Sequence, residues 1–286
     1  MATSQAFPDA DMPPLAFFEA TADGFEPLPF ANSAWSPTMI NGPAVCGLLA
    51  RALENAHCPA GFLPSRLTVD MFRPPQKATT TVLTSVVREG NRIVVADAVF
   101  RQGEQDMARA TAVFLKLSEQ PPGERWTRDA APVPPEVPPA DGPTVPLWNS
   151  NGRPDGWTGR IGDHQNSGHK KLWQAPISAV LGEAPSPFVG AAIIGESTSL
   201  LTNWSEEGVG FINADLTLAL TRPGEGLEIG LEADNHLSAD GVAVGSATLF
   251  DRRGAFGTCV VTALANAQRA VNFGKGYRHP SERLAQ

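Results

Sequence analysis

Apolar and polar side chains alternate along parts of the second half of the chain. The clearest run is LEIGLE at residues 227–232, in which Leu227, Ile229 and Leu231 alternate with Glu228, Gly230 and Glu232. A period of two is typical of a β-strand with one buried face and one face in water. The pattern therefore predicts a sheet whose outer face is solvated.

A similar series of phrases occurs twice. RLTVDMFRPPQ begins at residue 66 and DLTLALTRPGE at residue 215, and three extended runs follow each phrase. Turn-forming residues separate these runs at Glu89–Asn91 and Gln102–Gly103 in the first half, and at Asp240–Gly241 and Arg253–Gly254 in the second. Asn, Asp and Gly tolerate positive φ, so hairpins are expected at these breaks. Each half is therefore predicted to form an antiparallel meander.

One helix is predicted before each meander. Asn41-Gly42-Pro43 precedes AVCGLLARALENAH, in which leucines and alanines recur at helical spacing, and Pro43 suits the first helical position. Ser186-Pro187 begins FVGAAIIGESTSLLTNW in the same way. The second helix, from residue 188 to 201, is apolar nearly all round and must be covered on several sides. A curved antiparallel sheet wrapped around each helix satisfies this, so the predicted class is α+β.

A proline-rich segment separates the two halves. SEQPPGERWTRDAAPVPPEVPPADGPTVP, from residue 118 onward, contains too many prolines for a packed helix or strand. We expect an N-terminal unit at residues 16–117, a linker across the surface at 118–155, a C-terminal unit at 156–268 and a tail at 269–286.

Charge and composition exclude several classes of function. The chain has 286 residues, a formal net charge of -8 and a pI near 5.2, which disfavours binding to nucleic acid or anionic membranes. Any anionic ligand must meet local positive groups. Residues 1–14 lack the basic start and apolar stretch of a signal peptide, and no run is long enough to span a membrane, so a cytoplasmic location is expected.

The cysteines and histidines do not predict a metal site. Cys46, Cys58 and Cys259 are widely spaced and are expected to be buried free thiols. His164 and His169 are five positions apart, which would not place them on one side of a helix. No GxSxG, GxGxxG or P-loop motif occurs, which argues against a serine hydrolase or a common nucleotide-binding fold. No cofactor is expected.

The repeated helix-and-strand pattern, with the phrases LTVDMFRP, GEAPSPF and FINADLTLALTRP, resembles the double hotdog acyl-CoA thioesterases of the thioesterase II type. The resemblance covers roughly residues 16–117 and 156–266. It implies a tandem hotdog, in which two units pair edge to edge and hide unpaired sheet edges. The implied substrate is an acyl-CoA or a related thioester, and such proteins commonly associate further, so a homo-oligomer is an option.

The resemblance also implies three polar positions around a bound water. The acid falls on Glu196, the hydroxyl or amide position on Asn213, and the glutamine position on Val261, which departs from the family. A valine cannot hydrogen-bond to water or to an oxyanion, so either another group compensates or the enzyme is slow or inactive. The chain is therefore a thioester hydrolase or a non-catalytic acyl-thioester-binding protein with the same fold. A hotdog hydratase is a minor option, since WSPTMINGP contains no histidine.

Each of these residues also has a purely structural interpretation. Glu196, within an apolar helix, could instead turn to solvent or pair with a cation, and Asn213 could cap a strand or a turn. Ser197, Thr198 and Ser199 could add to the water site or simply bond back to the preceding helical turn.

Two further groups of residues are candidates for substrate binding. Asn41 and Gly42 at a helix start could form an oxyanion hole, as could the start of the second helix at residues 185–190, or these residues are plain helix caps. Arg73 and Arg222 precede proline at equivalent places and could bind the phosphates of coenzyme A, although pairing with carboxylates is the favoured interpretation. Lys170 and Lys171 form another positive pair, which could meet the same phosphates or equally lie in a solvated loop.

Overall fold

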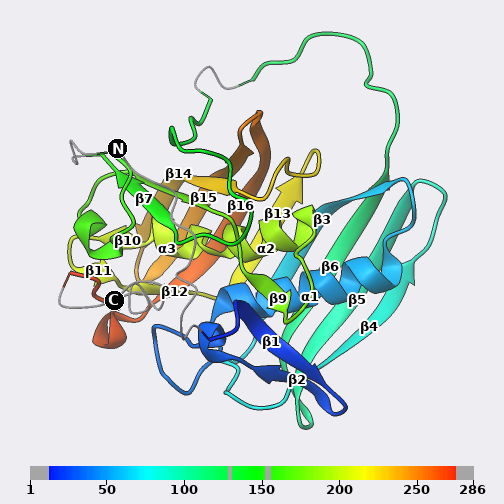
Figure 1. The fold of residues 1–286 in the computed structure, drawn as a ribbon, viewed down its shortest axis with the longest axis horizontal. Coiled ribbons are helices and arrows are strands. Elements are labelled where there is room, and N and C mark those ends of the chain that lie inside the picture. Colours follow the sequence, from blue (N-terminus) through cyan, green and yellow to red (C-terminus); the bar gives the residue numbers. More distant parts are fainter. Residues whose placement is uncertain (1–12, 128–130, 152–155, 275–286) are drawn as a thin grey trace.

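The computed structural model describes residues 13–127, 131–151 and 156–274. One large antiparallel sheet runs through the molecule, with strand order β4-β5-β6-β3-β13-β16-β15-β14-β8-β7 (Figure 1). Its strands are β3 (Phe62–Met71), β4 (Thr81–Arg88), β5 (Ile93–Gln102), β6 (Gln105–Lys116), β7 (Leu147–Ser150), β8 (Lys170–Gln174), β13 (Asp215–Leu220), β14 (Ile229–Ala239), β15 (Val242–Asp251) and β16 (Gly254–Ala265). The short β12 (Phe211–Asn213) also pairs with β16.

The two repeated phrases meet at the centre of this sheet. β3 and β13 pair in antiparallel register from Arg66 opposite Ala219 to Asp70 opposite Asp215, with Thr68 facing Thr217 in the middle. The strands of the first half thus lie on one side of this seam and those of the second half on the other. The seam satisfies the backbone groups of what would otherwise be two exposed edges.

The predicted hairpin turns are present. Asp240 and Gly241 both have positive φ, as do Gly103 and Gly254. This conformation matches the twist of paired strands and is easiest for glycine. The turn at Glu89–Asn91 does not use a positive φ at Gly90, so this turn connects its strands by a different backbone conformation.

Two helices pack against each other on the inner side of the sheet. α1 (Gly42–His57) begins after the cap Asn41, whose side chain accepts a hydrogen bond from the N–H of Ala44, and α2 (Pro187–Glu196) begins after the cap Ser186. The start of α1 lies beside the end of α2, and a methyl group added at Gly47 would lie 2.7 Å from the side chain of Ile193. The two helices therefore run antiparallel.

The second helix is shorter than predicted. Instead of one helix over residues 188–201, α2 ends at Glu196 and a separate short helix α3 (Thr198–Thr202) follows. Ser197 between them has ψ near -4°, and its N–H bonds to Ile194 three residues back. Ser and Thr favour helix ends over helix interiors, which explains the break in this Ser-Thr-Ser run. Glu196 thus lies at a helix end and not midway along a helix.

A small second sheet ties the N-terminal region to the second half. β1 (Ala16–Thr21) pairs with β2 (Gly24–Pro27) and, in parallel, with β9 (Ser178–Val180). The remaining elements are β10 (Trp204–Ser205) paired with β11 (Gly208–Val209), and the short 3-10 helices η1 (Pro29–Ala31), η2 (Ile161–His164) and η3 (Ala267–Arg269).

The prediction of a solvated outer face is wrong at the start of β14. Glu228 and Glu232 are buried, whereas Leu227 is exposed. Glu228 accepts hydrogen bonds from the indole of Trp173 at 2.8 Å and from Arg252 at 2.7 Å. A second small core forms here from Val137, Leu147, Trp173 and Phe250, with Trp157 packed against it.

The proline-rich segment contributes Val137 to this second small core. After Lys116 the chain leaves β6 and runs to β7, which lies at the opposite edge of the sheet from β4 (Figure 1). Between Lys116 and Leu147 the residues that the structure describes form no helix or strand, as the proline content predicts, but residues 147–150 of the expected linker form β7 at the sheet edge. No helix of the described residues is long and apolar enough to cross a membrane.

Candidate active site

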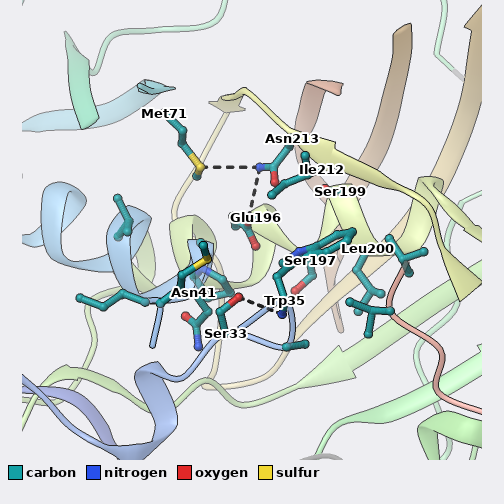
Figure 2. A pocket seen from close by; sticks show the side chains of 18 of the residues that line it. Ser33, Trp35, Asn41, Met71, Glu196, Ser197, Ser199, Leu200, Ile212 and Asn213 are labelled. Carbon is teal, nitrogen blue, oxygen red and sulfur yellow. Dashed lines mark hydrogen bonds between the residues drawn. The ribbon is translucent and has the colours of Figure 1, made fainter. Parts of the chain in front are cut away.

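A cavity of about 560 Å³ lies where the two halves meet, and residues of both line it. Its walls come from the start of α1, the end of β3, β12, the junction of α2 and α3, and the segment after β16 (Figure 2). Most lining side chains are apolar, including Trp35, Trp148, Ile177 and Phe273. The volume falls in the range typical of small-molecule sites.

Glu196 and Asn213 meet at one wall of this cavity. The Asn213 amide nitrogen donates a hydrogen bond of 3.1 Å to the Glu196 carboxyl (Figure 2). Glu196 is only 8% exposed, and no cation among the described residues forms an ion pair with it. Burial raises the pKa of Glu196 to about 8, and the hydrogen bond from Asn213 offsets part of the increase. The sequence-based alternative of a solvent-facing or ion-paired Glu196 is therefore wrong.

A break between β12 and β13 directs Asn213 toward Glu196. Ala214 belongs to neither strand, and its N–H donates to the carbonyl of Thr262 on β16. The Asp215 carboxylate then accepts hydrogen bonds from the N–H and the hydroxyl of Thr262. These bonds fix the irregular backbone, and they also hold Thr262 on the sheet face opposite to Val261, as strand alternation predicts.

The start of α1 lies directly beside the Glu196 carboxyl. A methyl group built on Gly42 would overlap the carboxyl and would lie 3.0 Å from Cγ of Glu196, so only glycine fits. The side chain of Asn41 caps Ala44 and donates to the carbonyl of Phe30 at 2.7 Å. Asn41 is thus a structural cap that also lines the cavity.

One backbone donor remains available at this helix start. The N–H of Val45 bonds to the Asn41 carbonyl, and Pro43 has no N–H. Among the described residues, none accepts a hydrogen bond from the N–H of Gly42. Because the first N–H groups of a helix have no intrahelical partner and carry partial positive charge, Gly42 presents a donor for a developing negative charge.

The second predicted oxyanion position lies elsewhere. Ser186 at the start of α2 lines a separate pocket of about 60 Å³, where its hydroxyl caps Val189 and donates to Glu54 on α1. The ion pair between Arg51 and Glu183 also lines this pocket. α2 has ten residues, so its start is roughly 15 Å from Glu196.

Val261 does not line the cavity. It is fully buried within the main hydrophobic core, opposite Gly245 of β15. Ser197 and Ser199 do line the cavity, whereas Thr198 does not. The structure therefore brings Glu196, Asn213, Asn41 and Gly42 together and leaves Val261 behind the cavity wall.

Several lining residues were missed from the sequence. Met71 contacts the Asn213 amide at 3.9 Å, and Val271 and Phe273 line the cavity although residues 269–286 were expected to form a tail. Val271 exchanges two backbone hydrogen bonds with Val209, which anchors this segment beside the cavity. An isolated bridge of this kind leaves no periodic pattern in the sequence.

Arg73 and Arg222, which precede proline at equivalent places in the two halves, have different partners. Arg222 forms a two-pronged ion pair with the fully buried Asp251, at 2.5 and 2.8 Å, as the favoured interpretation predicted. For Arg73 the same interpretation is wrong. Its side chain pairs with no carboxylate among the described residues, donates only to the backbone carbonyl of Asp106 and lines the cavity. The Asp106 carboxylate is bonded to Arg101 instead.

The lysine pair fits neither alternative, since neither side chain lines the cavity and Lys170 is buried. Lys170 is 2% exposed, donates to the backbone carbonyls of Asn166 and Gly168, and lies over the Trp204 ring. Burial lowers its pKa to about 8. Lys171 pairs with Glu232 at 3.2 Å. Among the described residues, no three His, Cys, Asp or Glu side chains are grouped as metal ligands.

Comparisons with known proteins agree with this architecture. Residues 31–115 match the acyl-CoA thioesterase N-terminal domain, whereas no curated protein matches the chain significantly. Similar solved structures include a hot dog fold protein of unknown function from Alicyclobacillus acidocaldarius, with a TM-score of 0.61, 15% identity and coverage of 82% of this chain and 90% of the other.

Two further structures carry thioesterase names. A tesB protein from Mycobacterium avium subspecies paratuberculosis has a TM-score of 0.58 at 16% identity, over 79% of this chain and 87% of the other. An acyl-CoA thioesterase II from Mycobacterium marinum has a TM-score of 0.57 at 14% identity, over 78% and 90%. At these identities the likeness establishes the hotdog fold. Residues 31–115 thus match the acyl-CoA thioesterase N-terminal domain, and the chain as a whole resembles the thioesterase II-like hotdog proteins.

Proposed function

We propose that this chain is a tandem hotdog protein that hydrolyses acyl-CoA thioesters with water as the nucleophile. The two units would be residues 16–117 and 156–268, joined at the β3–β13 seam. The observation that carries the proposal is the buried Glu196, bonded to Asn213 at 3.1 Å, in an apolar cavity beside Gly42 at the start of α1.

In this proposal Glu196 is the general base. A carboxyl with a pKa of about 8 holds a proton more strongly than an ordinary glutamate, and it is poised near neutral pH to accept one from water. Asn213 uses its amide nitrogen for Glu196, which leaves its carbonyl oxygen to accept a hydrogen bond from the same water. The pair thus orients a lone pair of the water toward the thioester carbon.

Attack of the water would form a C–O bond and place negative charge on the former carbonyl oxygen. The N–H of Gly42 would stabilise that charge by donating a hydrogen bond to the oxygen. It belongs to the first turn of α1 and has no other acceptor among the described residues. Collapse of the intermediate breaks the C–S bond and releases the coenzyme A thiolate. A thiolate is a good leaving group, so water placement and oxyanion stabilisation are the main demands on the protein.

The proposal is tested by thiol release from a series of acyl-CoA substrates, with Glu196→Gln and Asn213→Ala as variants. Loss of about 100-fold or more in kcat for Glu196→Gln, with the fold retained by circular dichroism, is expected. Unchanged turnover in Glu196→Gln would rule out the assigned base.

The second candidate is a non-catalytic acyl-thioester-binding protein. It is favoured by the absence of a third polar partner at position 261, where Val261 is buried in the core. Tight binding of a long-chain acyl-CoA without any thiol release, in wild type and in Glu196→Gln alike, would support this candidate over the enzyme.

A further inference from the structure

Two arginines lie at the exposed part of the cavity lining. Arg73 follows β3 and Arg269 ends η3, and both side chains line the cavity while their residues are exposed. Neither forms an ion pair with a carboxylate among the described residues. Their charges are therefore available to a ligand in the cavity.

The surroundings of Arg73 explain why its charge is free. Its counterpart Arg222 is neutralised by Asp251, whereas Arg73 donates to the Asp106 carbonyl at 3.1 Å and the Asp106 carboxylate is held by Arg101 at 2.7 Å. The single backbone bond anchors the guanidinium without compensating its charge. Most of its five donors remain free for an anion.

The two arginines flank opposite ends of β12, the strand that carries Asn213. The N–H of Met71 bonds to Ala214, just after the end of β12, and Arg73 is two residues beyond Met71. The N–H of Asn266 bonds to Gly210, just before the start of β12, and Arg269 is three residues beyond Asn266. The cavity therefore presents two separate positive points outside the Glu196–Asn213 pair.

This placement is notable in an acidic chain. With a net charge of -8, the overall field opposes an approaching anion, so an anionic ligand depends on local cations. Guanidinium groups bind phosphate oxygens with short, charge-assisted hydrogen bonds. Coenzyme A carries its diphosphate and its ribose phosphate at separate positions, beyond a neutral arm that ends at the sulfur.

We propose that Arg73 and Arg269 bind the phosphate groups of coenzyme A and thereby select nucleotide-linked thioesters. This inference rests on the proposed function, because it assumes that the thioester reaches Glu196. Two separated cations fit a ligand with two phosphate positions better than the single phosphodiester of a carrier-protein arm. The neutral pantetheine arm would then lie in the cavity between the arginines and Glu196.

The test compares Arg73→Ala/Arg269→Ala with wild type on three thioesters of the same acyl group. These are the coenzyme A thioester, the 4′-phosphopantetheine thioester and the uncharged N-acetylcysteamine thioester. Arg109→Ala/Arg253→Ala is the matched control, since it removes the same charge at two exposed arginines that do not line the cavity and pair with Asp70 and Glu225.

We expect KM for the coenzyme A thioester to rise about tenfold or more in the cavity variant, with kcat unchanged. KM for the N-acetylcysteamine thioester should not change, and the control should behave as wild type. An equal rise for charged and uncharged thioesters, a fall in kcat alone, or the same rise in the control would overturn the proposal. So would wild-type preference for the phosphopantetheine thioester over the coenzyme A thioester.

Calorimetric binding of coenzyme A itself separates this inference from the proposed function. If wild type binds coenzyme A, the cavity variant loses binding and no thioester is hydrolysed, the arginine site stands and the hydrolase assignment fails. If thioesters are hydrolysed but coenzyme A binds the variant and wild type equally, the arginine site fails and the hydrolase assignment stands.

Discussion

Gly42 lies so close to Glu196 that any side chain at position 42 would overlap the carboxyl. Gly42→Ala is therefore expected to displace Glu196 from Asn213 and to reduce kcat/KM by about 100-fold, because misplacement of a base by an ångström is enough for such a loss. The measurement is thiol release from an acyl-CoA, together with the denaturation midpoint of the same variant.

Gly47→Ala is the matched control for this variant. It introduces a methyl group 2.7 Å from Ile193 on the same pair of helices but away from the carboxyl. Overpacking of this kind costs about 1–3 kcal/mol of stability. If both variants lose activity only in proportion to their loss of stability, the contact at Gly42 has no special role in catalysis.

The pH dependence of hydrolysis should follow the pKa of Glu196. Since burial raises this pKa to about 8, the base is mostly protonated at neutral pH, and kcat/KM should rise with pH and level off above about 8. The Asn213 hydrogen bond lowers the pKa, so Asn213→Ala should shift the rise to higher pH. A flat profile from pH 6 to 9 would contradict the role of Glu196 as base.

The same group should make stability fall as pH rises. The folded protein keeps the Glu196 proton up to about pH 8, whereas the unfolded chain releases it near 4.5. Between these values the folded state binds one more proton, and the free energy of unfolding decreases by up to about 1.4 kcal/mol per pH unit. Stability is therefore fully present below pH 4.5 and reduced above 8.

Glu196→Gln removes this dependence, since an amide resembles the protonated carboxyl. At pH 8–9 the variant should be more stable than wild type by up to roughly 5 kcal/mol, as measured by urea unfolding. Glu19→Gln, at an exposed carboxyl, is the control. A variant that is no more stable at pH 9 than at pH 5 relative to wild type would argue against a buried, protonated Glu196.

Asp251 is expected to contribute strongly to the stability of the second half of the chain. Burial alone would raise its pKa, but hydrogen bonds from Arg222 and from the N–H groups of Glu225 and Arg253 lower it. Asp251→Asn leaves Arg222 without its partner and should reduce stability by about 3 kcal/mol. Unfolding in urea at pH 7 measures this, and Arg73→Ala, which breaks no ion pair, should cost less than about 1 kcal/mol.

The pH dependence of this contribution has the opposite sign to that of Glu196. Because the folded-state pKa of Asp251 lies below its ordinary value of 3.8, the contribution is present above about pH 3.8 and is lost as pH falls through the folded-state pKa. Wild type should therefore lose more stability on acidification than Asp251→Asn does.

Features that repeat in the sequence could be predicted from it. Turn residues and helix caps occurred at matching places in both halves, and the structure places the hairpins and the starts of both helices accordingly. The edge-to-edge pairing was implied by the family resemblance alone, which did not specify that β3 and β13 are the paired strands. The proximity of Glu196 and Asn213 could also be predicted, because the family resemblance assigned both to one site. In the structure the Asn213 amide nitrogen lies 3.1 Å from the Glu196 carboxyl oxygen.

Features that depend on contacts between distant segments could not be predicted. Glu228 was expected in water, but Trp173 on β8 and Arg252 in the turn between β15 and β16 cover it. Arg73 and Arg222 have the same sequence context, and only the carboxylates around them decide that one is paired and the other free. Val271 lines the cavity through an isolated backbone bridge that no local pattern reveals.

The antiparallel packing of α1 and α2 gives the helix pair two ends that are not alike. At one, the end of α2 brings Glu196 to Gly42 in the large cavity; at the other, Ser186 and Glu54 are bonded to each other and the Arg51–Glu183 pair fills the space. Of these two places, only the one at Glu196 opens into the large cavity. On the proposed function we therefore expect a stoichiometry of one thioester per polypeptide, half of what a symmetric pair of such units would bind.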